Sequence, residues 1–486
     1  MTSSSMTIIR SASIYDGTGA KPFDGDVSIE GDRISAVSKV GRAPTGANEI
    51  DGKGLAIAPG FIDAHTHDDR IVLDAPDMLP KISQGVTSVV VGNCGISLAP
   101  VVFDRDPPPP MNLLGGREAY EFSTFASYAK AIEMKCPAVN VAALIGHSAL
   151  RLATMNDITR KASDAEIKRM HALVDEAIAN GAAGFSSGLF YPTNAAADGD
   201  EVTRVAARFA KHGGVYATHM RDEFDHVLDS IDETARTAAA AKIPVVVSHH
   251  KCAGPANWGR TQQTLPRLET IAASQRLNLD VYPYAAGSTN LRADLVTDQY
   301  RIQISWSKPH PEMAGRDLSD IATQWACDLA EAARRLDPAG AIYFQMDEAD
   351  VRRVMSSKLA MIGSDGLPHD LHPHPRLWGT FPRVIGHYAR DLGLFSIEAA
   401  IHKMTGLTAE VFGLRDRGRI SEGAFADLVI FDPKTILDRA TYDSPLQQSE
   451  GIERVYVNGT LSFERQLGVT ARAGKLISKR NEKTSK

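Results

Sequence analysis

The chain has 486 residues, of which 43% are hydrophobic and 23% charged, and its formal net charge is −6 at pH 7. This length permits a large core and two or three domains, and the acidic balance argues against a nucleic-acid scaffold. No apolar run approaches the ~20 residues needed to span a bilayer, so no membrane segment is expected either.

The cysteines and the first residues indicate the compartment. The chain has four scattered cysteines and no C-x-x-C pair, a pattern typical of a reducing compartment rather than a disulfide framework. Residues 1–6 lack a charged region followed by an apolar one, so no secretory signal is visible. We expect a cytosolic protein whose Lys/Arg-rich segment near Lys479 is solvated and disordered.

Both ends of the chain are rich in β-forming residues. Near the start, the expected strands are residues 7–10, 26–30 and 33–37, with a hairpin signal at Gly31-Asp32. β character returns after Arg415, over residues 418–431 and 455–459. We therefore expect residues 1–59 and 411–478 to pair into one small β-sandwich.

Between these ends the pattern is strand, loop and helix, repeated. Amphipathic stretches such as residues 164–179 and 226–241 alternate with apolar runs. Eight such repeats over about 350 residues predict an α/β fold, a (β/α)8 TIM-like barrel over residues 60–410. The expected strands are residues 55–62, 87–91, 139–145, 183–186, 214–218, 243–248, 278–282 and 360–363.

Two interruptions break the repeat. Residues 104–110 read Asp-Arg-Asp-Pro-Pro-Pro-Pro and predict a stiff loop after the second strand. Residues 285–346 follow the seventh strand, where a βα connection is ordinarily only ~2–6 residues. This stretch is expected to be an inserted, lid-like segment over the barrel mouth.

Chemically capable side chains follow the expected strands at their carboxyl ends, where such barrels place catalytic groups. The first strand ends in His65-Thr66-His67, and residues i and i+2 of an extended chain point to the same side. Two converging imidazoles suit a metal, although a bare H-x-H also fits two ordinary polar histidines. With the later strand ends, the set predicts a metal-dependent hydrolase. Those strand ends carry Cys94, Tyr191, His219, His249 with His250, Tyr282 and Asp365.

Five of these stretches together resemble the D-aminoacylases, the N-acyl-D-amino-acid deacylases of the amidohydrolase superfamily. The resemblance covers essentially the whole chain, and Gly-Asn-Cys-Gly and Gly-Ser-Asp-Gly-Leu-Pro-His are specific to this branch. It implies zinc-dependent hydrolysis of a small N-acyl-D-amino acid to a carboxylate, such as acetate, and the free D-amino acid. The five stretches are residues 60–69, 91–95, 218–221, 248–251 and 363–369.

The resemblance also implies a ligand set. Cys94, His219 and His249 would hold one zinc tightly with a position left for water, and His65 and His67 would form a weaker second site with Cys94. The fourth strand carries no lysine that could become the bridging carboxylated lysine of many amidohydrolases, and Cys94 is implied in that anionic role. A small buried hydrophobe is the ordinary alternative for this cysteine.

The resemblance implies that Asp365 is the general base and then the general acid. The ordinary alternative is a turn aspartate before Gly366. The free α-carboxylate of the substrate needs cations and hydroxyls. Arg376, Tyr282 and Ser288 are favoured for that contact by their positions. Lys251 and Tyr191 are further candidates; surface charge and core packing are the ordinary alternatives for these cations and tyrosines.

Other functions stay open at this stage. An amidohydrolase acting on cyclic amides or dipeptides keeps the fold, although the missing lysine argues against the cyclic-amide branches. A non-catalytic scaffold should have lost a ligand or the aspartate, and every expected position is filled. The D-side chain, the acyl group, the number of metals and the oligomeric state are also open. Arg292 would read an acidic side chain or be mere surface charge; we expect a neutral, hydrophobic preference.

Overall fold

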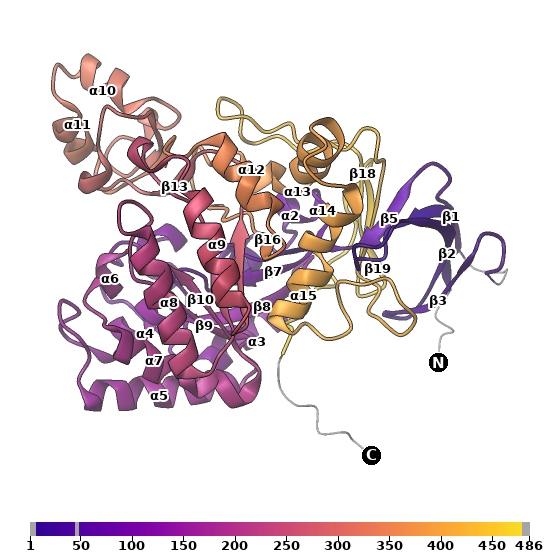
Figure 1. Ribbon diagram of the computed structural model, residues 1–486, viewed down its shortest axis with the longest axis horizontal. Coiled ribbons are helices and arrows are strands. Elements are labelled where there is room, and N and C mark those ends of the chain that lie inside the picture. Colours follow the sequence, from indigo (N-terminus) through magenta and orange to yellow (C-terminus); the bar gives the residue numbers. More distant parts are fainter. Residues whose placement is uncertain (1–5, 44–47, 479–486) are drawn as a thin grey trace.

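The computed structural model describes residues 6–43 and 48–478, so the expectation for the segment near Lys479 falls outside the described residues. Within these ranges, eight parallel strands form one sheet whose spatial order follows the chain, from β6 to β16 (Figure 1). Helices cover its outer face, which confirms the predicted (β/α)8 barrel. The barrel strands are β6 (Phe61–Asp63), β7 (Val86–Val91), β8 (Asn140–Gly146), β9 (Gly184–Gly188), β10 (Val215–His219), β11 (Val245–Val247), β12 (Leu277–Val281) and β16 (Ala360–Ile362).

The first predicted strand, residues 55–62, is in fact two strands in two sheets. β5 (Ala56–Pro59) pairs with strands of the terminal sheet, whereas β6 pairs with β7 of the barrel. Gly60 separates them at a close approach, because a Cβ there would lie 2.1 Å from Cγ2 of Thr87. The chain therefore passes from one sheet into the other within a single residue.

Strands from both ends of the chain join one sheet, in the order β20-β19-β18-β17-β5-β1-β2-β3, with β4 paired to β1. This confirms that the termini pair. Residues 418–427, expected to be β-rich, contribute only the bridge between Arg33 and Phe425 within the described chain, because positive φ angles at Gly418 and Gly423 interrupt the extended backbone. These strands are β1 (Thr7–Ile14), β2 (Phe23–Glu30), β3 (Arg33–Lys39), β4 (Asn48–Asp51), β17 (Leu428–Phe431), β18 (Ile452–Val457), β19 (Thr460–Glu464) and β20 (Gly468–Val469). The domain boundaries stay a prediction.

Helix α5 (Asp164–Ala179) shows why the helices form where the sequence pattern predicts them. Ser163 and Glu166 make a reciprocal capping box at its start. Ile167, Met170 and Val174 recur at helical spacing and are buried. The other longer helices around the barrel are α3 (Phe125–Lys135), α4 (His147–Thr154), α7 (Gly199–Ala206), α8 (Val227–Ala241), α9 (Thr261–Ala272), α12 (Glu348–Ser356), α13 (Arg376–Arg383) and α14 (Ile397–Met404).

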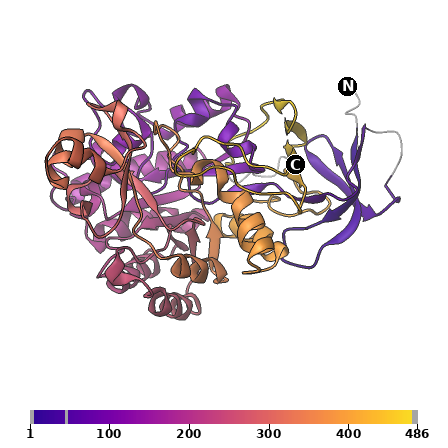
Figure 2. The same cartoon turned by 90° about the horizontal axis from the view of Figure 1, so that it is seen from above.

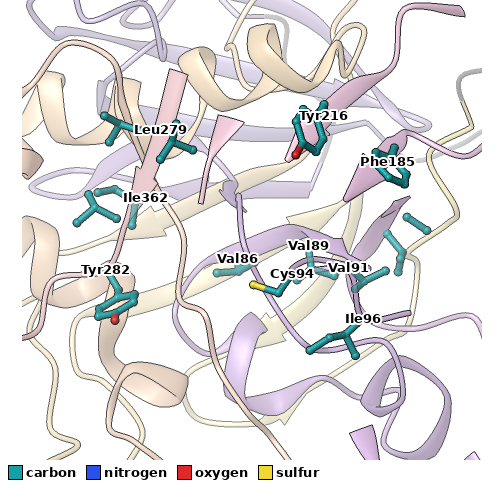
Figure 3. Close-up of a cluster of buried hydrophobic side chains, with 14 of the residues drawn as sticks. Val86, Val89, Val91, Cys94, Ile96, Phe185, Tyr216, Leu279, Tyr282 and Ile362 are labelled. Atoms are coloured by element: carbon teal, nitrogen blue, oxygen red, sulfur yellow. The ribbon is translucent and has the colours of Figure 1, made fainter. Parts of the chain in front are cut away.

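The barrel interior is a packed core rather than a channel. Along β7, Val90 belongs to the interior cluster while Val89 and Val91 belong to the cluster outside the barrel (Figure 3). Phe412 of α15 (Gly406–Phe412) joins the interior cluster and is fully buried. The helix that carries Phe412 therefore shares the apolar core of the barrel interior with the strands.

The insertion between β12 and β16 folds into a small unit with its own apolar cluster, which Phe190 and Phe224 of the barrel loops contact. Its elements are β13 (Gly287–Asn290), β14 (Ile302–Ser307), β15 (Ala339–Tyr343), α10 (Leu318–Gln324) and α11 (Leu329–Leu336). In both views it lies at the end of the molecule farthest from the β1–β3 strands (Figures 1 and 2).

The insertion also reaches the loops at the carboxyl ends of the barrel strands. Asn290 donates to Oδ1 of Asn112 at 2.9 Å, and Lys308 pairs with Asp106 of the proline-rich loop at 2.7 Å. It therefore covers the mouth as expected. Within the described residues, no helix combines the length and the apolar character needed to cross a membrane.

Candidate metal and catalytic site

Three imidazoles converge on the sulfur of Cys94 at the carboxyl ends of the barrel strands. The Sγ atom lies 3.3 Å from Nε2 of His65, 3.3 Å from Nε2 of His249 and 3.8 Å from Nδ1 of His219. All four residues are buried. Figure 3 shows Cys94 beside Val86, Val89 and Val91 of β7, with Tyr282 also in view. The sequence-predicted ligands are thus one cluster.

Asp365 lies beside the two histidines of the H-x-H motif. Its Oδ1 atom is 3.2 Å from Nε2 of His67 and 3.5 Å from Nε2 of His65, and its Oδ2 atom is 2.9 Å from Nη1 of Arg376. Arg376 is fully buried at the start of α13. The carboxylate therefore lies between the histidine pair and a fixed guanidinium.

The surroundings favour the ionised forms of the thiol and the carboxyl group. Burial raises the pKa of Cys94, but the charges of His65 and His249 outweigh it and hold that pKa well below the usual value. Burial likewise raises the pKa of Asp365, yet Arg376 and His65 bring it well below its ordinary range. A thiolate and a carboxylate are the charged donor types that a cation requires.

The backbone at three of these residues is held in the left-handed region. The φ angle is +54° at Cys94, +37° at His249 and +51° at Asp365. None is glycine, and each such conformation costs about 1–3 kcal/mol. The strand ends are thus held in strained conformations at the residues that carry the reactive side chains.

Two carboxylates that motif reasoning missed lie around the imidazoles. Glu223 contacts Nδ1 of His249 at 3.1 Å and Nε2 of His219 at 3.4 Å. Asp280 contacts Nδ1 of His65 at 3.3 Å and accepts from the backbone N–H of His249 at 2.8 Å. Such partners fix the orientation of ligating imidazoles. A signal existed for Asp280: it is a charged residue within an expected strand.

Three of the five candidates for binding the substrate carboxylate lie together, and the other two have partners of their own. Arg376 lies 4.5 Å above the Tyr282 ring and donates to the backbone oxygen of Ser288 at 3.2 Å, so these three lie together. The Ser288 hydroxyl is buried and has no hydrogen-bond partner among the described residues. Lys251 is held by both oxygens of Glu223 at 2.7 Å, and the Tyr191 hydroxyl lies 3.1 Å from that of Thr289.

His250 points away from the cluster. Its Nε2 atom lies 2.8 Å from the Thr264 hydroxyl, and burial lowers its pKa to about 4. A neutral, hydrogen-bonded ring of this kind fits the structural role expected from its alternation with His249.

The donor set fits a metal ion of the zinc type. Among the described residues, three overlapping groups have ligating atoms within 4.8 Å of one another. They combine soft sulfur, imidazole nitrogen and carboxylate oxygen, which together suit Zn²⁺. The groups are His65, Cys94 and His249; His65, His67 and Asp365; and His219, Glu223 and His249.

Comparison with known proteins agrees with this geometry. The model of the "Amidohydrolase family" matches residues 48–463. The D-aminoacylase of Alcaligenes xylosoxydans xylosoxydans is 49% identical over 97% of both chains. The chain belongs to the D-aminoacylase branch of the amidohydrolases. Two further members from that organism are also similar: an N-acyl-D-aspartate deacylase, 47% identical over 97% of this chain and 94% of its own, and an N-acyl-D-glutamate deacylase, 45% identical over 97% and 96%.

Solved amidohydrolases of this branch have the same fold. A D-aminoacylase described with a binuclear metal centre has a TM-score of 0.95 and 49% identity, over 97% of this chain and 99% of that one. The N-acyl-D-glutamate deacylase of Bordetella bronchiseptica, complexed with zinc and a phosphonate mimic of the tetrahedral intermediate, has a TM-score of 0.93 and 42% identity over the same shares. A metal cofactor is therefore a property of the branch.

Proposed function

We propose that this protein hydrolyses N-acyl-D-amino acids to a carboxylate and the free D-amino acid with zinc as cofactor. The observation that carries the proposal is the placement of Asp365 between the H-x-H histidines and Arg376, beside the Cys94 cluster. This single arrangement supplies metal ligands, a proton-transfer group and a cation. The similarity to a D-aminoacylase and to N-acyl-D-aspartate and N-acyl-D-glutamate deacylases supports it.

Cys94, His219 and His249 would hold the tight zinc, and His65 and His67 would hold a weaker one together with Cys94. Zinc bound there supplies Lewis-acid polarisation of the acyl carbonyl and an activated water near neutral pH. Glu223 orients the outer nitrogens of His219 and His249, and Lys251 neutralises Glu223. Lys251 thereby acts through Glu223 as well as being a candidate for substrate binding.

Asp365 would accept a proton from the attacking water and return it to the leaving nitrogen. Departure of an amine from a tetrahedral intermediate requires that proton, so one group acts in both steps. Arg376 keeps the carboxylate in place at 2.9 Å. Its guanidinium also lies over Tyr282 and next to Ser288, where it can contact the substrate carboxylate with their hydroxyls.

The experiment is turnover by the purified protein with measured zinc content. We expect release of D-methionine from N-acetyl-D-methionine and at least 100-fold slower release from the L-isomer, because the two enantiomers cannot place both amide and carboxylate alike (~10²-fold is typical of one lost contact set). Turnover of a cyclic amide or a dipeptide with none of the acylated D-residue would refute the proposal.

We also propose that the enzyme prefers neutral D-side chains. Arg292, the cation nearest in sequence to the Ser288 position, is already occupied: it pairs with Asp294 at 2.7 Å and donates to the backbone oxygen of Phe190 at 3.1 Å. It lies 4.1 Å over the Phe190 ring, which stacks on His219. The acidic side chain of a substrate would have to displace Asp294 from Arg292 before it could pair with that guanidinium.

We expect kcat/KM for N-acetyl-D-leucine or D-methionine to exceed that for N-acetyl-D-glutamate or D-aspartate. Arg301→Ala is the matched control for Arg292→Ala, since Arg301 also pairs with an aspartate, at 2.8 Å, and lies over an aromatic ring of the insertion. A strong wild-type preference for acidic residues that Arg292→Ala alone removes would overturn this proposal. A cytosolic location stays an expectation from the four free thiols.

A further inference from the structure

A buried lysine joins the two halves of the site where the barrel sheet is interrupted. The ladder runs continuously from β6 round to β16, but within the described chain β6 and β16 do not pair with each other; one isolated bridge, Thr66 to Gly366, joins the loops just beyond them. We call the line between them the seam. Isolated hydrogen bonds cross it, such as Ala64 N–H to the oxygen of Ile362 at 3.2 Å and Asp365 N–H to that of His65 at 2.7 Å.

The seam is where the H-x-H loop meets the loop of Asp365. Both histidines of the motif contact the Asp365 carboxylate across it. Gly363 is pressed against His65, because a Cβ at that glycine would lie 2.6 Å from Cβ of His65. The relative position of His65, His67 and Asp365 therefore depends on how the seam is held.

Lys81 reaches both sides of the seam from the short helix α2 (Leu79–Ile82). Its ammonium lies 2.9 Å from Oδ2 of Asp63 and 3.4 Å from Oδ2 of Asp68, which flank the H-x-H motif. It also donates to the Ser364 hydroxyl, the residue before Asp365, at 2.6 Å. With 1% of its surface exposed, Lys81 is buried, donates to Asp63 and Ser364 and forms an ion pair with Asp68.

Further hydrogen bonds fix the segments on which Lys81 and its partners lie. Oδ1 of Asp63 accepts the Ser364 N–H at 2.7 Å, so the carboxylate itself spans the seam. Three residues after Lys81, Gln84 donates to the backbone oxygen of Leu377 at 2.8 Å and accepts from the N–H of Phe381 at 3.2 Å. Those residues lie on α13, whose first residue is Arg376.

We propose that Lys81 is a positioning residue for the reaction, which holds Asp365 in register with His65 and His67 by bridging Asp63, Asp68 and Ser364 across the seam. It does not touch the Cys94, His219 and His249 set, so its effect should be confined to the Asp365 side of the site. The inference rests on the proposed function for its kinetic readout, and a metal-binding readout is independent of it.

The test compares Lys81→Met with Lys403→Met in the full-length zinc enzyme. Lys403 is the matched control: it is buried, and its ammonium donates to the backbone oxygens of Ser357 and Ala360 at the other end of β16. For Lys81→Met we expect kcat to fall about 100-fold, the cost of misplacing a reacting group by about 1 Å. KM should change little, since the loss concerns the transition state. Lys403→Met should lower the thermal midpoint without lowering kcat.

Zinc titration against a competing chelator gives the independent readout. Lys81→Met should keep the tight zinc and weaken a second zinc about 10- to 100-fold, the range for a lost supporting contact. If the wild-type protein shows no turnover, the proposed function is refuted, but the zinc affinities of the wild type and of Lys81→Met can still be compared. Unchanged kcat and unchanged zinc affinities in a folded Lys81→Met protein would overturn the positioning role.

A milder variant covers the case in which Lys81→Met does not fold. Ser364→Ala removes the hydroxyl that accepts from Lys81 and from the N–H of Gly366, and it leaves the ion pairs of Lys81 with Asp63 and Asp68 intact. We expect a smaller loss of kcat in the same direction, with the thermal midpoint close to that of the wild type. If both variants fold, the double variant should lose less kcat than the product of the two single losses, because both changes remove the same contact. Fully additive losses of kcat, or full activity in Ser364→Ala, would overturn the proposal.

Discussion

Replacing Asp365 by asparagine should separate the catalytic role of this carboxylate from its structural one. From the sequence alone, so nearly isosteric a change is expected to leave folding unaltered. The structure changes that expectation, because Asp365 is the carboxylate that pairs with the fully buried Arg376 within the described chain, at 2.9 Å. Other than that pair, the guanidinium donates to the backbone oxygen of Ser288 at 3.2 Å.

Two magnitudes follow. Loss of a positioned proton-transfer group lowers kcat by about 10²–10⁴-fold, which corresponds to roughly 3–5 kcal/mol of activation free energy. Breaking a buried charge pair destabilises a protein by about 3–5 kcal/mol, and the amide oxygen that asparagine retains keeps the loss toward the lower end. Asp365→Asn should therefore lose both activity and free energy of unfolding.

The double variant Asp365→Asn with Arg376→Met tells the two losses apart. Removing the unpaired guanidinium should recover most of the free energy of unfolding, measured by urea denaturation with zinc held constant, whereas kcat should stay low. A fall in kcat of less than about tenfold in Asp365→Asn would refute the proton-transfer role, since that is below the usual range. An unchanged urea midpoint would refute the charge-pair reasoning.

Three further changes test other parts of the site and of the barrel. Cys94→Ala should lose the tight zinc and the activity together, as metal analysis would show, because the thiolate would be the anionic donor of the proposed zinc site. Glu223→Gln should weaken zinc binding about 10- to 100-fold in a chelator competition, because it loosens both His219 and His249. Phe412→Ala should destabilise the fold by about 3–5 kcal/mol in urea while leaving KM unchanged, because this fully buried ring belongs to the apolar core of the barrel interior and not to the site. Full zinc in Cys94→Ala, wild-type affinity in Glu223→Gln, or an unaltered urea midpoint in Phe412→Ala would contradict the corresponding argument.

The sequence predicted the barrel because its signals are local. Each strand is a short apolar run, and α5 carries its own capping box, so that residues 164–179 were predicted with the bounds that the structure gives. The candidate ligands could be picked out in the same way, since each follows a strand end, whereas their roles were implied by the resemblance to the D-aminoacylases. Local patterning could not divide residues 55–62 between two sheets, because that division depends on the close approach of Thr87 to Gly60.

The supporting shell of the site was beyond local patterning. Glu223 lies in a loop, four residues after His219, and nothing in its own stretch distinguishes it from a solvated glutamate. Its significance comes from Lys251 and His249, which the fold brings to it from the next strand end. Likewise, Lys81 and Ser364 are 283 residues apart, and their contact arises only when the barrel closes.

The pairing of β5 with β17 has a consequence for synthesis of the protein. Leu428 pairs with Pro59, roughly 370 residues earlier in the chain. At about 5–20 residues per second, a ribosome needs some 20–70 seconds to make that interval. Throughout this time the edge of β5 that later binds β17 has no native partner, immediately before the strand that leads to His65. Exposed strand edges pair readily with other chains, so the yield of active enzyme should depend on expression rate and on chaperones more strongly than its final stability indicates.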